Sequence, residues 1–323
     1  MLEELTGKGL LIHHWDADGI CSAALLIKHL TNKKLDNRTP ELGNYYLTND
    51  ELETYSKYDY VIIADMNFPE DNILRLAKNA KIMIFDHHLG KVINQVFHHN
   101  PIIKGENPDK YPSSSWIVND FLKNEINLFS LLGIVGDHEQ KIKNNLEFYN
   151  LITKFSEKNK INFDDMLKMV YLLDSNYKLG DKKTVEEAPH ILIKNEKPNF
   201  ILKNKKWNKN FDTLNKEMEK QFNMPPDEIN DIILKRINTQ YNIISTLTRK
   251  VAWSSGKNTV IINTGFFDDM DQIYVRSKKD AEPLIMKGKA LGYKCGGKKE
   301  VLGAIVPKEK TESFLKEILE FLK

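Results

Sequence analysis

The sequence has few cysteines, no long apolar run and almost no net charge. Its two cysteines, Cys21 and Cys295, lie far apart and lack the spacing of a metal-binding pair. A disulfide framework is therefore not expected, and a reducing cytoplasm fits. No apolar run reaches the ~20 residues that span a bilayer. The acidic start, Met1-Leu2-Glu3-Glu4, differs from the basic start of a secretory signal. We therefore expect a cytoplasmic protein without a membrane segment.

The small net charge of +2 conceals an uneven distribution. Residues 182–323 hold 27 Lys and Arg against 19 Asp and Glu, whereas the rest holds 20 against 26. An acidic part can bind cations, and a basic part can bind a polyanion. The alternative is an ordinary solvated Lys-rich surface. At roughly 100–200 residues per domain, a chain of 323 residues suggests two domains.

Three short apolar runs, residues 9–13, 60–64 and 81–85, are each followed by polar residues. Such runs are typical of buried parallel strands, and open α/β sheets bind ligands at the carboxyl ends of their strands. A further strand is expected at 45–48, and helices at 20–30 and 71–80. We therefore expect a mostly parallel N-terminal sheet flanked by helices.

Metal-type ligands follow these predicted strands. His14, Asp16 and Asp18 alternate in a strand-to-helix turn, so extended backbone would point them the same way. Asp18 alone could instead cap the helix. Asp65 follows the second run, and Asp86, His87 and His88 follow the third. Residues 128–135 form an apolar run that could be a helix or a strand, and Gly136 and Asp137 follow it.

The remaining chain divides by pattern. A helix is predicted to begin at Ser113, Ser114 and Ser115. Their hydroxyls could cap the helix, or their backbone amides could bind a phosphate, and capping is favoured. Residues 145–248 read as helical, including a helix at 226–246, with a loop at 195–210. After strands at 250–254, 259–263 and 272–275 come a helix at 281–291, a strand at 301–306 and a final helix at 311–322. We expect domains at 1–180 and 249–323, the latter a smaller α+β domain, and a helical connector at 181–248.

The motifs resemble those of the DHH phosphoesterase superfamily. They are His14-Trp15-Asp16-Ala17-Asp18-Gly19, Asp65, Asp86-His87-His88, and Asp137 after Gly136. The C-terminal segment resembles the DHH-associated domain through Arg276-Ser277 and, loosely, Gly296-Gly297-Lys298 followed by Gly303. Lys298 stands where that family usually has His. The sequence of the first motif is most similar to that of RecJ-like and archaeal RecJ-related nucleases.

The resemblance implies a site for two Mn²⁺ ions, although residue types leave Mg²⁺ or Zn²⁺ open. It implies that His14, Asp16 and Asp65 hold one ion and that Asp18, Asp65, His87 and Asp137 hold the other. His88 would face the scissile phosphate, and Asp86 would orient a histidine from behind. The implied substrate-binding residues are Arg276, Ser277, Gly296, Gly297 and Lys298.

Three functions remain open on these grounds. The first is a phosphodiesterase that releases nucleotides from one end of single-stranded DNA or RNA, bound in a cleft between the domains, by metal-activated water. Exposed aromatics among Trp207, Trp253 and Tyr293 would stack bases, although Trp253 reads more readily as core. The second is a hydrolase of short oligonucleotides, cyclic dinucleotides or nucleoside bisphosphates. The third is a non-catalytic binding partner in replication or repair.

Overall fold

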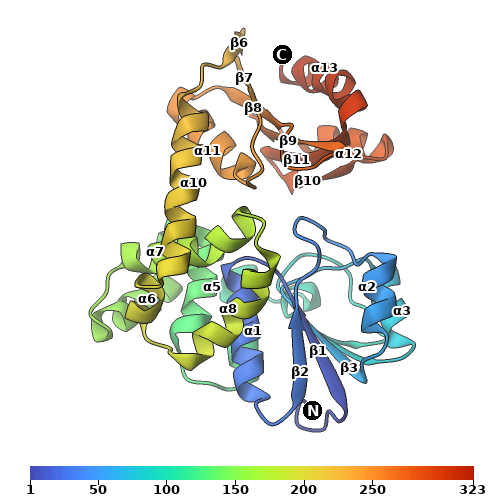
Figure 1. Cartoon of the computed structure of the whole chain (residues 1–323), viewed down its shortest axis with the longest axis vertical. Helices are drawn as coiled ribbons and strands as arrows, with labels where there is room; N and C mark the ends of the chain where they lie inside the picture. The colour runs from blue at the N-terminus through green and yellow to red at the C-terminus, as the bar shows by residue number, and fades with distance from the viewer. The chain divides into compact units, whose positions relative to one another are not determined.

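The computed structural model describes residues 1–323 apart from the side chain of Lys298. The chain forms two compact units (Figure 1). The first comprises Met1–Tyr177 and Asp181–Phe211, and the second comprises Lys178–Gly180 and Asp212–Lys323. Each unit contains one sheet, so the predicted α/β class with a smaller second α+β part is confirmed.

The first unit is built on a five-stranded parallel sheet with the order β2-β1-β3-β4-β5. Its strands are β1 (Lys8–His13), β2 (Lys34–Arg38), β3 (Tyr60–Ala64), β4 (Lys81–Phe85) and β5 (Phe97–His99). β3 is buried along its whole length, and β1 and β4 are buried after their first residue, as expected of strands covered on both faces.

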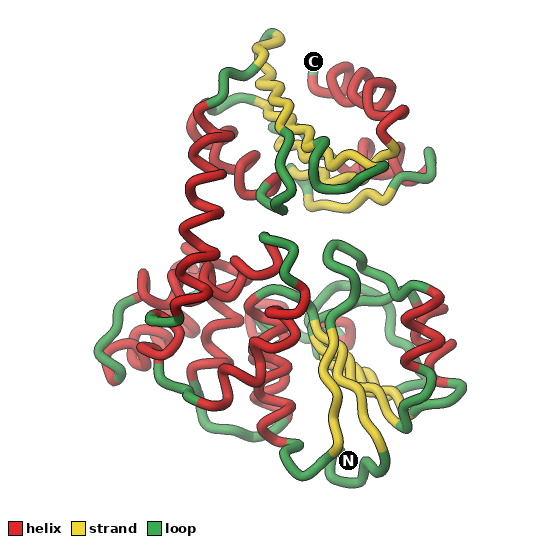
Figure 2. The backbone as a smooth tube through the Cα atoms, viewed as in Figure 1, coloured by secondary structure: helices red, strands yellow, loops and turns green.

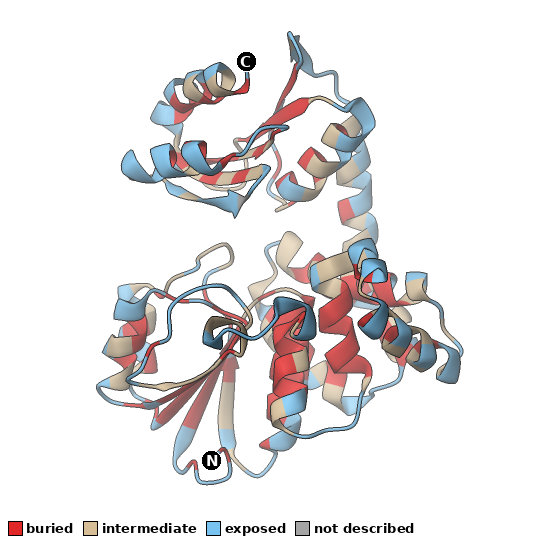
Figure 3. Ribbon diagram, turned by 180° about the vertical axis from the view of Figure 1, so that it is seen from behind, coloured by how far each residue is buried: buried red, intermediate tan, exposed pale blue. Residues whose placement is uncertain are grey.

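Helices lie on both sides of this sheet (Figures 1 and 2). The helices from Ala17 to Asn223 are α1 (Ala17–His29), α2 (Asn49–Tyr55), α3 (Glu70–Ala77), α4 (Ser114–Phe121), α5 (Leu128–His138), α6 (Leu146–Lys158), α7 (Phe163–Lys178), α8 (Lys182–Lys194), α9 (Pro198–Leu202) and α10 (Lys205–Asn223), of which α10 continues from the first unit into the second. Short 3₁₀ turns occur at Ile102–Lys104, Pro108–Lys110 and Glu139–Asn144. α1 is buried from Ala17 to Ile27 and contributes its apolar residues to the core (Figure 3).

The second unit contains a six-stranded mixed sheet with the order β10-β11-β9-β8-β7-β6. Its strands are β6 (Asp227–Ile229), β7 (Ile232–Ile237), β8 (Asn258–Asn263), β9 (Met270–Arg276), β10 (Lys294–Lys298) and β11 (Val301–Pro307). Helix α11 (Ile244–Ser255) packs on one face. Helices α12 (Glu282–Ala290) and α13 (Thr311–Leu322), the latter preceded by a 3₁₀ turn at Lys308–Lys310, pack on the other.

Several predicted elements are wrong. Residues 45–48 are a loop, and the second strand is instead β2, a polar edge strand that pairs with β1. Residues 226–246, predicted as a helix, form β6, β7 and the start of α11, while 250–254, predicted as a strand, lie inside α11. Residues 195–210 include α9 and the start of α10 rather than one loop. β7 pairs in parallel with β8 through a crossover that contains α11. The two strands lie over twenty residues apart in the sequence, so local periodicity cannot predict that they pair.

Residues 128–135, for which the sequence left helix and strand open, are helical and lie in α5. Among the described residues, no helix is both long and apolar enough to traverse a lipid bilayer.

Candidate metal centre

The candidate site lies where three parallel strands end at one edge of the first sheet. The residue after each strand extends the ladder by one hydrogen bond, because its backbone N–H donates to the neighbouring strand or its extension. These bonds run from His14 to the Ala64 carbonyl (3.2 Å), from Asp65 to that of Phe85 (2.9 Å) and from Asp86 to that of His99 (3.2 Å). The backbone thus fixes the polar residues at the carboxyl ends of the strands, where α/β sheets bind ligands.

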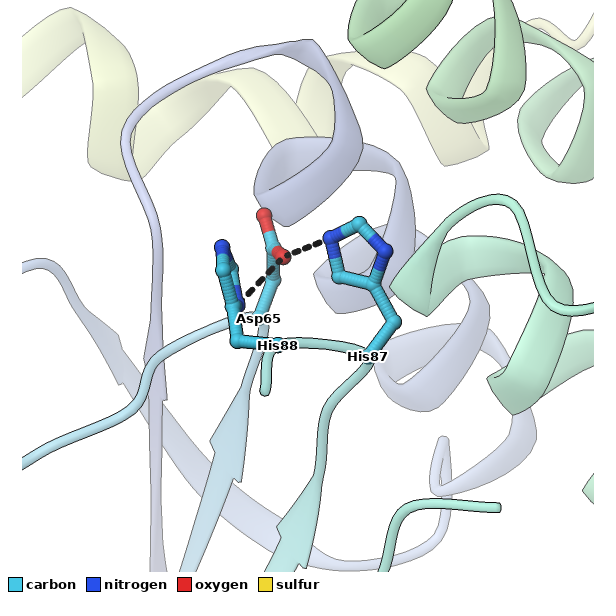
Figure 4. A group of neighbouring side chains, drawn as sticks. All are labelled: Asp65, His87 and His88. Atoms are coloured by element: carbon cyan, nitrogen blue, oxygen red, sulfur yellow. Dashed lines mark ion pairs between the residues drawn. The ribbon is translucent and has the colours of Figure 1, made fainter. Parts of the chain in front are cut away.

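Six residues predicted as ligands, together with His88, form three overlapping groups. In each group the potential ligand atoms lie within 4.8 Å of one another: His14, Asp16 and Asp65; Asp18, His87 and Asp137; and Asp65, His87 and His88. Figure 4 shows the two imidazoles of the third group on either side of the Asp65 carboxylate. Asp65 Oδ1 lies 3.6 Å from His87 Nε2 and 4.0 Å from His88 Nδ1. Two groups share Asp65 and two share His87.

Asp65 is the most constrained of these residues. Its backbone adopts a left-handed conformation, with φ of 61°, at the end of β3. The residue is 2% exposed, and Oδ1 accepts a hydrogen bond from Ser114 Oγ at 2.9 Å. Burial raises the pKa of Asp65 well above its usual range, and the charges of Asp18, Asp16 and Asp137 raise it further. Buried carboxylates packed this closely repel one another unless a proton or a cation lies between them.

Asp18 connects the site to helix α4. Its Oδ2 accepts the backbone N–H of Ser114 at 2.6 Å, and its Oδ1 accepts that of Ser115 at 2.9 Å. These two amides are therefore occupied by a carboxylate, and the suggestion that they receive a phosphate is wrong. Ser113 caps α4 as favoured, since its hydroxyl accepts the Trp116 N–H at 3.1 Å.

Gly133 of α5 makes room for this connection. A Cβ atom at Gly133 would lie 2.0 Å from Asp18 Oδ1 and 2.0 Å from Ser115 Oγ. Both positions are far inside van der Waals contact, so a side chain here requires Asp18 or α4 to move. Helix α5 thus approaches Asp18 closely because Gly133 has no side chain, and one turn later it supplies Asp137 to the site.

Asp16 caps helix α1, so the alternative that Asp18 is the cap is wrong. Asp16 Oδ1 accepts the Gly19 N–H at 3.1 Å, and Oδ2 lies 2.8 Å from His14 Nδ1. Burial acts to raise the pKa of Asp16, but the charge of the nearby His14 and the hydrogen bond from the Gly19 N–H outweigh it, so the pKa is lowered. Despite the short distance to Asp16, both ring nitrogens of His14 are buried without a well-directed hydrogen bond among the described residues. Metal coordination would satisfy such nitrogens.

His88 is oriented by Asp86 and by a residue that sequence reasoning missed. His88 Nδ1 donates to Asp86 Oδ1 at 2.7 Å. The buried amide of Asn100 donates to the His88 carbonyl at 2.9 Å and lies 3.5 Å from Asp86 Oδ2. Burial acts to lower the pKa of His88, but the Asp86 hydrogen bond and charge outweigh it, so the pKa is raised. For His87, burial dominates and lowers the pKa.

Two further supports come from residues outside the predicted ligand set. Asp174 of α7 accepts the Ala17 N–H at 3.0 Å, which holds the first turn of α1 from 157 residues away. His13 is fully buried, with Nδ1 2.6 Å from the His14 carbonyl and Nε2 3.2 Å from the Asn37 amide. No local pattern at Asp174 predicts such a role, so only the fold reveals it.

The predicted substrate-binding residues lie in the second unit. Arg276 of β9 pairs with Val301 of β11, which in turn pairs with Lys298 of β10. The Lys298 side chain lies outside the described residues. Ser277 is buried, and its hydroxyl accepts the Lys279 N–H at 2.9 Å. The two glycines differ: a Cβ at Gly297 would lie 1.8 Å from the Val301 carbonyl oxygen, whereas one at Gly296 would meet open space.

The three candidate aromatics have different environments. Trp207 is fully buried in the first unit, which excludes it from stacking on a ligand. Tyr293 is half-buried, with its ring 5.2 Å from that of Phe314. Trp253 is 67% exposed, so its interpretation as a core residue is wrong.

Comparison with known proteins supports the fold and the family. The likeness to exonuclease RecJ bound to manganese has a TM-score of 0.72 at 14% identity and covers 99% of this chain and 92% of that one. RecJ from Thermus thermophilus in complex with Mn²⁺ gives 0.70 at 15% identity, over 99% of this chain but only 53% of that one, so the chain spans about half of its length. A pGpG-specific phosphodiesterase from Vibrio cholerae gives 0.51 at 12% identity, with 98% of both chains covered.

At these identities the structural likenesses show the fold alone. No curated protein matches the chain in sequence. A family model described as the DHH family, N-terminal domain, matches residues 9–159, which contain every residue of the three groups. Residues 9–159 therefore form the N-terminal domain of the DHH family.

Proposed function

We propose that the protein is a metal-dependent phosphodiesterase that releases nucleotides from one end of single-stranded DNA or RNA. One observation carries this proposal, namely that three overlapping groups of His and Asp ligand atoms meet at the carboxyl ends of the strands, two of them sharing the buried carboxylate of Asp65. DHH superfamily members are metal-dependent phosphoesterases, and the neighbours in fold include nucleases and a phosphodiesterase.

Two metal ions, which we propose to be Mn²⁺, fit the residues present. His14, Asp16 and Asp65 would hold one ion, and Asp18, Asp65, His87 and Asp137 would hold the other. The orphaned ring nitrogens of His14 and the crowded carboxylates around Asp65 support this assignment. Imidazole and carboxylate together suit Mn²⁺. When bound, a pair of such ions supplies a water of lowered pKa and neutralises the charge of a phosphate.

The chain's own residues then position the substrate and move a proton. Because Nδ1 of His88 donates to Asp86, Nε2 is the nitrogen left to face a ligand. The imidazole side chain is 46% exposed, and Asp86 favours its protonated form. We propose that Nε2–H of His88 donates to a phosphate oxygen and passes its proton to the leaving oxygen. Asp86 and Asn100 keep the ring in this orientation.

We propose that the second unit binds the strand. Arg276 and Lys298 would neutralise phosphates, Arg through a bidentate contact and Lys as a point charge. The open space above Gly296 suits a closely approaching ligand. Ser277 would act indirectly, by holding the turn that follows Arg276, since its hydroxyl already accepts the Lys279 N–H. The excess of basic residues in 182–323 supports a polyanionic substrate.

A second candidate is a hydrolase of short oligonucleotides, cyclic dinucleotides or nucleoside bisphosphates. The likeness to a pGpG-specific phosphodiesterase over nearly the whole of both chains favours keeping it. A purely non-catalytic role in replication or repair is less well supported, because the complete set of His and Asp donors has no evident use in a protein that only binds.

A degradation assay tests the proposal and separates the candidates. With Mn²⁺, the wild-type chain should shorten a long single strand labelled at one end, and blocking that end or the other should reveal the polarity. The double variant Asp65→Asn with Asp137→Asn should be inactive and folded. Undiminished activity in this variant would overturn the assignment. Hydrolysis of a dinucleotide without shortening of the long strand would select the second candidate.

A further inference from the structure

Trp253 of α11 is a large aromatic side chain that the fold of the second unit leaves in solvent. It is 67% exposed, whereas the buried side of α11 consists of Ile244, Leu247, Thr248 and Val251. Exposing an indole forgoes the favourable burial of a large apolar surface. An indole left this exposed is therefore a candidate contact for another molecule.

Two arginines flank the exposed ring. Arg249 lies one turn earlier in α11, with its guanidinium carbon 5.5 Å from the Trp253 ring centroid. Arg276, at the end of β9, reaches the same ring at 5.7 Å. Both distances fall within the range of cation–π contact. With two-thirds of its surface exposed, the indole nevertheless remains accessible from solvent.

Arg276 has a further property that points to an anion. Its Nε is buried and lacks a hydrogen-bond acceptor. Among the described residues, no carboxylate lies within ion-pair distance of its guanidinium, and no side-chain hydrogen bond is made by it. A guanidinium held in place without an acceptor is prepared to receive one, and phosphate matches its planar donors.

The combination of a flat open ring and an adjoining unsatisfied guanidinium matches a nucleotide. A nucleobase stacks on an aromatic face without regard to its identity, and a phosphate one step along the chain lies within reach of a neighbouring arginine. The basic excess of residues 182–323 favours such a polyanion over an apolar protein surface. We propose that Trp253 and Arg276 bind one nucleotide of a single strand, with the base on the indole and the phosphate on the guanidinium. This inference rests on the proposed function and names the residue that recognises the base.

Binding can be measured without hydrolysis on the full chain in EDTA. Among four tryptophans, Trp15 and Trp207 are buried and Trp116 is partly buried, so a stacked base should quench mainly Trp253. A hexathymidylate should quench the wild-type fluorescence. Trp253→Ala should abolish the quenching and weaken binding, measured by anisotropy, about tenfold to a hundredfold. Trp253→Phe should remain within about threefold, and the exposed Met286→Ala on α12 serves as the control.

A strand of abasic deoxyribose phosphates separates base stacking from phosphate contact. Trp253→Ala should leave its affinity unchanged, whereas Arg276→Ala should weaken both strands. Equal loss for both strands in Trp253→Ala, or no loss for the thymidylate, would overturn the inference. A wild-type dimer that Trp253→Ala dissociates, with oligonucleotide binding unaffected, would overturn it in favour of a protein contact. Because EDTA prevents turnover, failure of the proposed hydrolysis would not affect this measurement.

Discussion

Asp18 Oδ2 lies 2.6 Å from the backbone nitrogen of Ser114, although 96 residues separate the two in the sequence. With the second bond from Ser115, this carboxylate connects the first turn of α1 to the first turn of α4. A negative charge at the start of a helix is also favoured by the helix dipole. Asp18 thus contributes to the fold as well as to the candidate metal centre.

This dual role predicts different effects of two similar substitutions. Asp18→Asn should destabilise the chain by about 1–3 kcal/mol, because an amide NH₂ cannot accept one of the two buried N–H groups. Asp137→Asn, at a partly exposed position, should change stability by less than about 0.5 kcal/mol. Urea unfolding in EDTA measures both. Equal stability of the two variants would contradict a structural role for Asp18.

Gly133→Ala should disturb the same contact from the opposite side. The added Cβ would overlap Asp18 Oδ1, so we expect a loss of about 1–3 kcal/mol despite the higher helix propensity of alanine. Gly136→Ala is the matched control, since its Cβ would lie 3.3 Å from that of Ala17. Thermal unfolding of both variants compares them. A Gly133→Ala protein as stable as the control would show that α4 adjusts freely.

The raised pKa of Asp65 predicts how pH affects the metal-free chain. An acid whose pKa rises on folding stabilises the fold while protonated, and this contribution is lost as pH rises from its ordinary value near 4 through the raised pKa. Asp65→Asn removes the buried charge, so the variant should be more stable than wild type at pH 8. At pH 4 the stabilities of the two proteins should differ less. Melting curves in EDTA test this, and a wild-type chain that is the more stable at pH 8 would refute it.

The pair formed by His88 and Asp86 predicts a shift in the pH–rate profile. Asp86→Asn removes the interaction that keeps the pKa of His88 raised, so the alkaline limb of kcat/KM should move to lower pH. His88→Gln should lower kcat by about 10²–10⁴-fold while Mn²⁺ is still bound. The exposed His190→Gln on α8 is the control. An unshifted limb in Asp86→Asn would exclude His88 as the proton donor.

The shared carboxylate predicts the number of ions that each variant binds. Wild type should bind two Mn²⁺ ions by calorimetry, and His14→Ala should lose one while retaining the other. Asp137→Ala should lose the second ion selectively, and Asp65→Asn should lose both. The control is Glu187→Gln at an exposed position of α8, which should bind as wild type does. One ion in the wild type, or two in Asp65→Asn, would contradict the proposed assignment.

The sequence predicts the fold class and the motif positions because both depend on local patterns. β3 and β4 are continuous apolar runs that end in Asp65 and Asp86, and parallel strands necessarily bring such ends to one edge. The match of residues 9–159 confirms the family resemblance. The role of each ligand stays a prediction.

Other features depend on contacts between distant residues and have no local signature. β2 is polar and lies at the sheet edge, so its apolar periodicity is weak. Asp174 and Asn100 support motif residues through hydrogen bonds between distant parts of the chain, which leave no sequence spacing to recognise. The exposure of Trp253 has no local signature either, because the sequence predicts a strand at residues 250–254, in which a large aromatic residue is readily interpreted as core.

The left-handed backbone of Asp65 limits how this site can change during evolution. Few residue types tolerate that conformation, chiefly Gly, Asn and Asp, and of these only Asp carries an anionic ligand. Glutamate or cysteine would offer a donor atom but would strain the strand end by about 1–2 kcal/mol. The position is therefore restricted twice, once by its chemistry and once by the shape of the chain, and a lineage that loses this aspartate has few one-step replacements that restore it.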